Sequence, residues 1–273
     1  MSVITISRQL GSLGTEIAEA VANRLNYQYV DKEKIGRALA DCGLPKIEIE
    51  KLDEKKPAFW DSWVTDRKKF FHYIQRVILD FAQKNNVVIL GRGGQILLKG
   101  VPGVLNVRII APLDVRIRRI KEQDGVDEMQ AVRRLKRNDQ DSGGFIRSFF
   151  NVDWEDSSLY DLVINTQKLS LDTGMKLILE SIQSAEIKEA EKRGEEKLAD
   201  LVLFQKVESA LGGLVGMGSI DMNIHVEEGV VTLEGTITSH VEKENCERAV
   251  MSIEGVKRLK NQLSVVRFYR HSE

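Results

Sequence analysis

The sequence predicts an α/β domain, built on a parallel sheet with flanking helices, followed by a small α+β domain of element order αββαβ. Three observations predict this. Short apolar runs alternate with helical patterns over residues 1–184, residues 185–199 are nearly all charged or alanine, and residues 200–268 change to hairpin-like alternation. Strands interleaved with helices at such spacing favour parallel pairing with right-handed crossovers. We therefore expect domains at 1–184 and 200–268, joined by a charged helical linker at 185–199.

The first domain contains one strand that is apolar throughout. Val87–Leu90 is closed by Gly91, which is typical of a buried parallel strand whose carboxyl end opens into a site. The remaining elements follow from shorter apolar runs and from helical periodicity. We expect further strands at 3–7, 27–30, 104–111 and 162–166, helices at 15–25 and 170–184, and basic helices between 112 and 147.

The second domain reads as one layer of helices on one sheet. Glu228 and Gly229 form a hairpin turn, Val231 and Leu233 alternate onto the core face, and Gly235 ends that strand. A further glycine, at 255, stops a helix before the last strand. The expected elements are a helix at 201–211, strands at 220–226 and 230–233, a helix at 240–253 and a strand at 256–266.

Composition and residue spacing argue against nucleic-acid-binding, disulfide-rich, metal-binding and membrane-spanning proteins. The 273 residues include 40 basic and 41 acidic ones, and the formal charge of −1 gives no argument for nucleic-acid binding. Cys42, Cys246 and the histidines share no ligand spacing, so we expect neither a disulfide scaffold nor a metal site. The start shows no leader pattern, and no apolar run is long enough for a transmembrane segment. We expect a cytoplasmic protein.

A glycine-rich loop over residues 7–16 lies between the first strand and the first helix. Glycines allow a tight turn there, and N–H groups at a helix start form a cradle for anions. The loop lacks the lysine of the GxxxxGK[ST] pattern, and Arg8 is its only cation. A purely structural βα turn is the alternative interpretation. The candidate phosphate-binding residues are Gly11, Ser12, Gly14 and Thr15.

A second loop delivers Arg92 among three glycines at the end of the strand 87–90, where side chains face the ligand crevice of an open sheet. Gly91 and Arg92 suit bidentate phosphate recognition, and an ion pair with a carboxylate is the alternative. Arg37 follows Asp31 on a helix, where arginines are usually surface residues. Of the arginines between 114 and 147, we expect two or three to contact a ligand and to act as a mobile lid.

These motifs resemble the cytidylate kinase-like family, relatives of the P-loop nucleoside monophosphate kinases. The resemblance covers about residues 1–184, and its most specific pieces are the loop 6–14 and the run 88–93. It implies a P-loop kinase-like sheet and transfer of the γ-phosphoryl of Mg-ATP to CMP or dCMP. It also implies that Arg37 and Arg92 meet the acceptor monophosphate, with Asp31 near its nucleoside. The family's arginine in place of the lysine is Arg8, and the lid residues carried over are Arg137 and Arg147.

The chain departs from authentic cytidylate kinases at three points. Gly14 stands where the lysine belongs, Gly93 stands where an aspartate follows the Gly-Arg pair, and the lid has no arginine between Arg137 and Arg147. Each lost transition-state cation typically costs about 2–4 kcal/mol. A nucleotide-binding regulatory protein with little turnover is therefore the alternative function.

The C-terminal segment resembles a BON domain, on residues 229–235 and 253–256. This resemblance implies a module that binds a small ligand, a protein or a lipid surface, and a surface-binding adaptor is a third hypothesis. We interpret Gly212–Gly218 as a flexible connection and not as a second phosphate loop. The aromatic residues Phe59, Trp60, Trp63, Phe70 and Phe71 are expected to pack an acceptor-side helical subdomain, with base stacking by one of them as the alternative.

Overall fold

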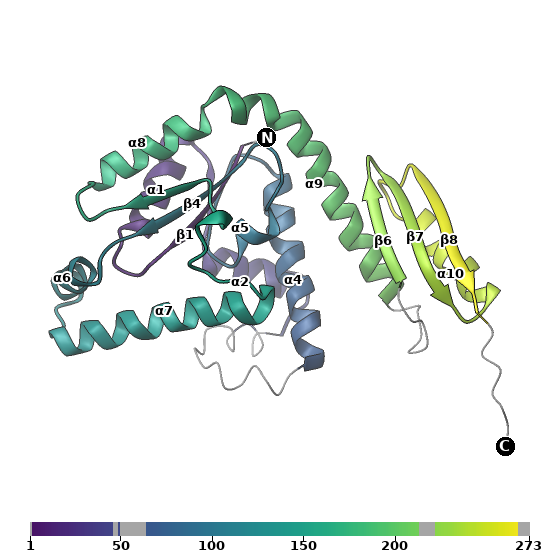
Figure 1. Ribbon diagram of the computed structural model, residues 1–273, viewed down its shortest axis with the longest axis horizontal. Coiled ribbons are helices and arrows are strands. Elements are labelled where there is room, and N and C mark those ends of the chain that lie inside the picture. The colour runs from purple at the N-terminus through teal and green to yellow at the C-terminus, as the bar shows by residue number, and fades with distance from the viewer. Residues whose placement is uncertain (1, 46–48, 50–63, 213–221, 267–273) are drawn as a thin grey trace, which may run out of the picture. The chain divides into compact units, whose positions relative to one another are not determined.

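The computed structural model describes residues 2–45, 49, 64–212 and 222–266. The chain divides into two compact units, residues 1–194 and 195–273 (Figure 1). The expected aromatic run 59–63 and the glycine segment 213–218 lie outside the described residues.

The first unit is built on a five-stranded sheet of order β2-β3-β1-β4-β5 (Figure 1). Every pair is parallel, as predicted. Strand β1 lies in the centre between β3 and β4, so the loops that follow β1 and β3 are neighbours at the carboxyl edge. The strands are β1 (Val3–Arg8), β2 (Gln28–Val30), β3 (Val87–Leu90), β4 (Val104–Ile110) and β5 (Leu162–Asn165).

Helices α1 (Gly14–Leu25) and α8 (Leu171–Ile182) cover one face of this sheet. Their apolar stripes, which include Ile17 and Ile178, share a buried core with strand residues such as Ile4. The other face is partly polar, because the hydroxyl of Thr5 donates to the side chain of Asn106 over 2.8 Å. The remaining elements are α2 (Lys32–Asp41), α4 (Val64–Gln83), α5 (Gly94–Leu97), α6 (Leu113–Asp124), α7 (Glu128–Phe150) and the short 3₁₀ turn η2 (Ser157–Leu159).

The segment expected to form a lid is part of one long helix, α7. The carboxylate of Asp127 caps this helix by accepting from the N–H of Gln130 over 2.7 Å. The helix then continues through Gly143 and Gly144, and in Figure 1 it runs from beside α6 toward α4. Arg137 and Arg147 are therefore presented by a helix.

The charged linker is also helical, and it continues without a break into the helix expected after it. Helix α9 spans Ala185–Gly212, because no proline separates the two expected pieces and glycine 194 alone is tolerated inside a helix. The boundary between the two units falls within α9, between residues 194 and 195.

The second unit is a three-stranded sheet of order β6-β7-β8 packed against helices. Its core contains Val207 of α9, Leu233 of β7 and Val250 of α10. The expectation that Gly235 ends a strand is wrong, because Gly235 pairs with Met222 on one side and Leu263 on the other. The elements are β6 (Met222–Glu227), β7 (Val230–Ile237), α10 (His240–Met251) and β8 (Arg258–Val265).

Candidate functional site

The glycine loop leads directly into the first turn of α1. Leu13, in the left-handed region at φ 65°, is the N-cap residue, and no side chain caps the helix. The first N–H groups of a helix need partners, and an anion is a suitable one. The start of α1 is therefore left without a side-chain cap, and phosphate binding by the backbone from Gly11 to Thr15 stays a prediction.

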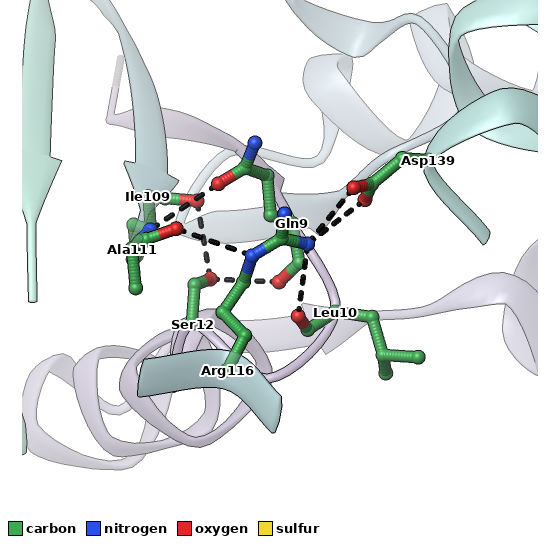
Figure 2. Close-up of polar contacts among 7 residues, drawn as sticks. All are labelled: Gln9, Leu10, Ser12, Ile109, Ala111, Arg116 and Asp139. Atoms are coloured by element: carbon green, nitrogen blue, oxygen red, sulfur yellow. Dashed lines mark hydrogen bonds and ion pairs between the residues drawn. The ribbon is translucent and has the colours of Figure 1, made fainter. Parts of the chain in front are cut away.

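The loop is held in shape by its own side chains. Ser12 is fully buried, and its hydroxyl donates to the carbonyls of Gln9 (2.7 Å) and Ile109 (3.1 Å), as Figure 2 shows. The side-chain oxygen of Gln9 in turn accepts from the N–H of Ala111 over 3.2 Å (Figure 2). The Ser12 side chain thus holds the shape of the loop through hydrogen bonds to two backbone carbonyls.

Arg8 crosses the space where a lysine at position 14 would begin. A Cβ atom at Gly14 would lie 2.3 Å from Cβ and 2.8 Å from Cγ of Arg8. A Cβ at Gly91 would lie 3.3 Å from Nη1 of Arg8. The arginine stem therefore packs on the first residue of α1, and its guanidinium extends toward the loop after β3. Glycine at position 14 is what allows this path.

The Arg8 guanidinium carries a charge that the described part of the chain does not balance with a carboxylate at ion-pair distance. Burial is the main cause that lowers its pKa; Tyr29 opposes this shift, Arg92 adds to it and Glu16 opposes it. A buried cation beside a second cation is costly unless an anion joins them. Arg8 and Arg92 together therefore favour binding of a polyanion between the loops.

The loop that follows β3, residues 91–93, has an unusual backbone. Gly91, Arg92 and Gly93 lie consecutively in the left-handed region, at φ 75°, 55° and 77°. For a residue with a Cβ this costs roughly 1–2 kcal/mol, and such conformations cluster at ligand sites. The Arg92 guanidinium lies 5.7 Å from the ring centre of Phe145. The left-handed backbone and the contact with the Phe145 ring together limit the directions in which the Arg92 side chain can point.

Position 93 is glycine because an aromatic ring occupies the space beside it. A Cβ there would lie 2.3 Å from Cζ of Phe150, the last residue of α7. Phe150 packs edge-on against Phe71 of α4, with ring centres 5.5 Å apart. The aspartate expected from the family pattern is thus replaced by a contact between the loop and a cluster formed by Phe70, Phe71, Phe145, Phe149 and Phe150.

Asp31 is the N-cap residue of α2, and Arg37 lies within this helix. The Asp31 carboxylate caps this helix by accepting from the N–H of Lys34 over 2.9 Å, which gives it a structural role in the free protein. Arg37 is exposed on the same helix, one and a half turns further along. The structure therefore brings Arg8, Gly14, Gly91 and Arg92 together, and it places Asp31 and Arg37 on the element that follows the edge strand β2.

The two arginines carried over from the lid are exposed on α7. Nε of Arg137 lies 3.9 Å from the carboxylate of Asp141, one helical turn away. Arg147 lies in the last turn of the helix, where a cation is favourable.

Two arginines that the sequence did not single out brace the site. Arg119 of α6 donates to the carbonyl of Gly11 (3.2 Å) and to the hydroxyl and carbonyl of Thr166 (3.0 and 2.8 Å). Arg116 of α6 is buried and contacts the same loop. The sequence could not distinguish Arg116 and Arg119 from surface arginines, because the exposed Arg118 lies in the same basic helix.

A buried arginine on the polar face of the sheet, Arg108, also stabilises the surroundings of the loop. The buried guanidinium of Arg108 lies 4.3 Å from the ring centre of Trp154 and donates to the Trp154 carbonyl and to the Tyr160 hydroxyl (3.1 Å). The indole N–H of Trp154 donates to the hydroxyl of Ser7 over 2.8 Å. The segment after α7 is thereby fastened to the residue that precedes Arg8.

In the second unit, the buried carboxylate of Asp200 accepts from the N–H groups of Glu228 (2.8 Å) and Gly229 (2.9 Å). This fixes the hairpin turn to α9. Across the described residues, no group of three or more acidic, histidine or cysteine side chains is arranged to hold a metal ion. None of the helices described is both long and apolar enough to cross a bilayer.

Comparison with known proteins agrees with these two units. The model of the cytidylate kinase-like family matches residues 3–168, and that of the BON domain matches residues 199–267. A cytidylate kinase of Methanocaldococcus jannaschii is 27% identical over 67% of this chain and 98% of its own length. A cytidylate kinase of Natronomonas pharaonis is 30% identical over 67% of this chain and 90% of its own length.

A crystal structure of an uncharacterized protein from Eubacterium ventriosum has the same fold as the first unit. It superposes with a TM-score of 0.55 at 24% identity, and covers 66% of this chain and 97% of that one. The matches over residues 3–168 and 199–267 show that this chain belongs to the cytidylate kinase-like family and carries a C-terminal BON domain.

Proposed function

We propose that the first unit transfers the γ-phosphoryl group of ATP to a nucleoside monophosphate, with CMP or dCMP as the favoured acceptor. The observation that carries this proposal is the path of Arg8 over Gly14 toward Gly91. It supplies a cation between the glycine loop, to which we assign the donor phosphates (the donor loop), and residues 91–93, to which we assign the acceptor phosphate (the acceptor loop), where authentic cytidylate kinases use a lysine. The relatives named cytidylate kinase support the choice of acceptor.

Catalysis of this kind consists of positioning and charge neutralisation. The uncapped first turn of α1 and the backbone of Gly11 bind donor phosphates, and Arg8 neutralises charge between the two loops. Arg92 binds the acceptor phosphate, with Arg37 supplied by α2. Arg137 and Arg147 would contribute when α7 approaches the nucleotide.

Mg²⁺ would arrive with ATP and neutralise charge on the donor phosphates. The residues present fit this role, because Thr15 follows the lysine position and offers a hydroxyl in the first turn of α1, where the P-loop pattern places a magnesium ligand. The unbalanced Arg8 charge and the uncapped helix start suit the polyphosphate that would carry the ion. Because the reaction consumes ATP, we place it in the cytoplasm.

The test is a coupled ADP-release assay with Mg-ATP against CMP, dCMP, UMP, AMP and GMP. We expect turnover with one pyrimidine acceptor and loss of at least 100-fold in the Arg92→Ala protein, since one preorganised donor contributes about that factor. The Arg133→Ala protein is the control, because Arg133 is an exposed arginine of α7 outside both loops. Turnover that survives Arg92→Ala would contradict the assignment of the acceptor loop.

A second function is favoured by the contact between Gly93 and Phe150. The ring stands where the family pattern places an acidic side chain, which points to a nucleotide-binding regulatory protein with little turnover that signals through its BON domain. Calorimetric binding of Mg-ATP without any turnover would support this function over the kinase.

For the BON domain we propose a role in binding a small ligand or a partner protein. Its signature residues have structural tasks, since Val231 and Leu233 are core residues and Gly229 makes the turn. Flotation of the full chain with liposomes, with and without nucleotide, tests the remaining possibility. Flotation without nucleotide would favour a surface-binding adaptor.

A further inference from the structure

Arg116 is packed against the turn of the glycine loop. It is 5% exposed, and a Cβ at Gly11 would lie 3.2 Å from both its Cβ and its carbonyl oxygen. Nε donates to the carbonyl of Ala111 (3.1 Å) and Nη1 to the carbonyl of Leu10 (3.4 Å), as seen in Figure 2. The arginine therefore contacts the loop at two successive residues, one of which has φ 75°.

The charge of Arg116 is balanced from α7. Nη1 donates to both carboxylate oxygens of Asp139, at 2.9 and 3.1 Å, and Figure 2 shows the aspartate reaching the guanidinium from the side opposite Ala111. Arg116 is buried and Asp139 is partly exposed, so removing the carboxylate leaves the buried guanidinium without its charge partner, and the geometry of Arg116 depends on Asp139. A single side chain of α6 thus links the donor loop to α7.

The other end of α7 contacts the acceptor loop. Phe150 packs on Gly93, and the Phe145 ring lies under the guanidinium of Arg92. Helix α7 is therefore tied to the glycine loop through Asp139 and to the acceptor loop through its last two turns. The distance between these loops decides whether donor and acceptor phosphates align, and a misplacement of about 1 Å can cost about 100-fold in rate.

We infer that Arg116 and Asp139 are positioning residues, which hold the donor-phosphate loop in register with α7 and, through it, with Arg92. We assign neither residue a contact with the nucleotide; both act through the glycine loop and α7. This inference rests on the proposed binding of ATP at the glycine loop, and it adds a second pair of residues on which that binding depends.

A matched control exists on the same two helices. Asp124 of α6 and Arg134 of α7 form an ion pair of 2.7 Å, with the arginine side chain 54% exposed. Asp124→Asn removes an α6–α7 ion pair as Asp139→Asn does, but without any contact to the glycine loop. Asp139→Glu keeps the charge and serves as the conservative variant.

The experiment measures Mg-ATP affinity by calorimetry and kcat and KM in the coupled assay, at a temperature where all variants remain folded. We expect Asp139→Asn to weaken Mg-ATP binding about tenfold or more, Asp139→Glu to recover most of the loss, and Asp124→Asn to bind as the wild type does. Equal affinities for Asp139→Asn and Asp124→Asn would overturn the inference.

Amide hydrogen exchange separates this inference from the proposed function. In the absence of nucleotide, Asp139→Asn should speed exchange of the N–H groups of residues 10–14, whereas Asp124→Asn should not. If the wild type neither binds ATP nor turns over, the proposed function fails, and the exchange data still decide whether Arg116 and Asp139 position the loop. Unchanged exchange in Asp139→Asn would overturn the inference independently.

Discussion

Replacing Gly14 by alanine tests the packing of Arg8 on α1. The new Cβ would lie 2.3 Å from Cβ of Arg8 and 3.3 Å from Cβ of Ile109. Carbon atoms in contact need about 3.5–4 Å, so the overlap with Arg8 is more than about 1 Å. The Arg8 Cβ is fixed to β1 and Ile109 stands nearby on β4, so relief requires a shift of α1 or of the strand.

The expected cost has two parts. Overpacking of this kind lowers the free energy of unfolding by about 1–3 kcal/mol. Displacing the Arg8 guanidinium from between the loops removes one preorganised charge, which typically lowers turnover about 100- to 1000-fold. Thermal unfolding measures the first effect, and the coupled ADP-release assay, run well below the melting temperature, measures the second.

Three companion variants complete the test. Gly36→Ala is the control, because its Cβ would meet Cγ2 of Ile49 at an ordinary 3.5 Å, and it should leave turnover unchanged. Gly14→Lys should be as inactive as Gly14→Ala, whereas Gly14→Lys combined with Arg8→Gly removes the overlap and should recover activity. Wild-type kcat and KM for ATP in Gly14→Ala would refute the reasoning.

Three further outcomes are expected. Gly93→Asp should lower the melting temperature and not raise turnover, because Phe150 blocks its Cβ and φ 77° is unfavourable for a residue with a side chain. The double variant with Phe150→Ala removes only the first of these costs and should recover part of the melting temperature; a gain of turnover in the single variant would contradict this. Burial first, then nearby carboxylates, raise the pKa of Tyr29 from 10.0 to about 12. The neutral phenol therefore stabilises the fold below pH 10, this contribution is lost as the pH rises toward 12, and Tyr29→Phe should flatten the alkaline fall in melting temperature. Asp200→Ala should speed hydrogen exchange of the 228 and 229 amides and cost about 1–3 kcal/mol locally; unchanged exchange would argue against that brace.

Much of the fold could be predicted from the sequence, because strands and helices leave local patterns. The apolar run 87–90 and the alternation around Val231 and Leu233 correspond to β3 and to the core face of β7. The structure differs from the predictions where the local sequence pattern was weak or where contacts between distant residues decided the conformation. Gly235 stays inside β7 because two neighbouring strands pair with it, and the segment expected to act as a mobile lid, which includes residues 137–147, is part of one long helix.

The sequence by itself determined the order of elements, the two glycine loops and the family, since each depends on residues that are close together in the chain. Only the tertiary structure decided what each arginine does. Arg116 and Arg119 lie in one basic helix with the exposed Arg118, yet the first two donate to carbonyls of the glycine loop that are 106 and 108 positions away in the sequence. Likewise, Gly14 is explained by the stem of Arg8 crossing it, a contact that exists only once β1 and α1 have folded together.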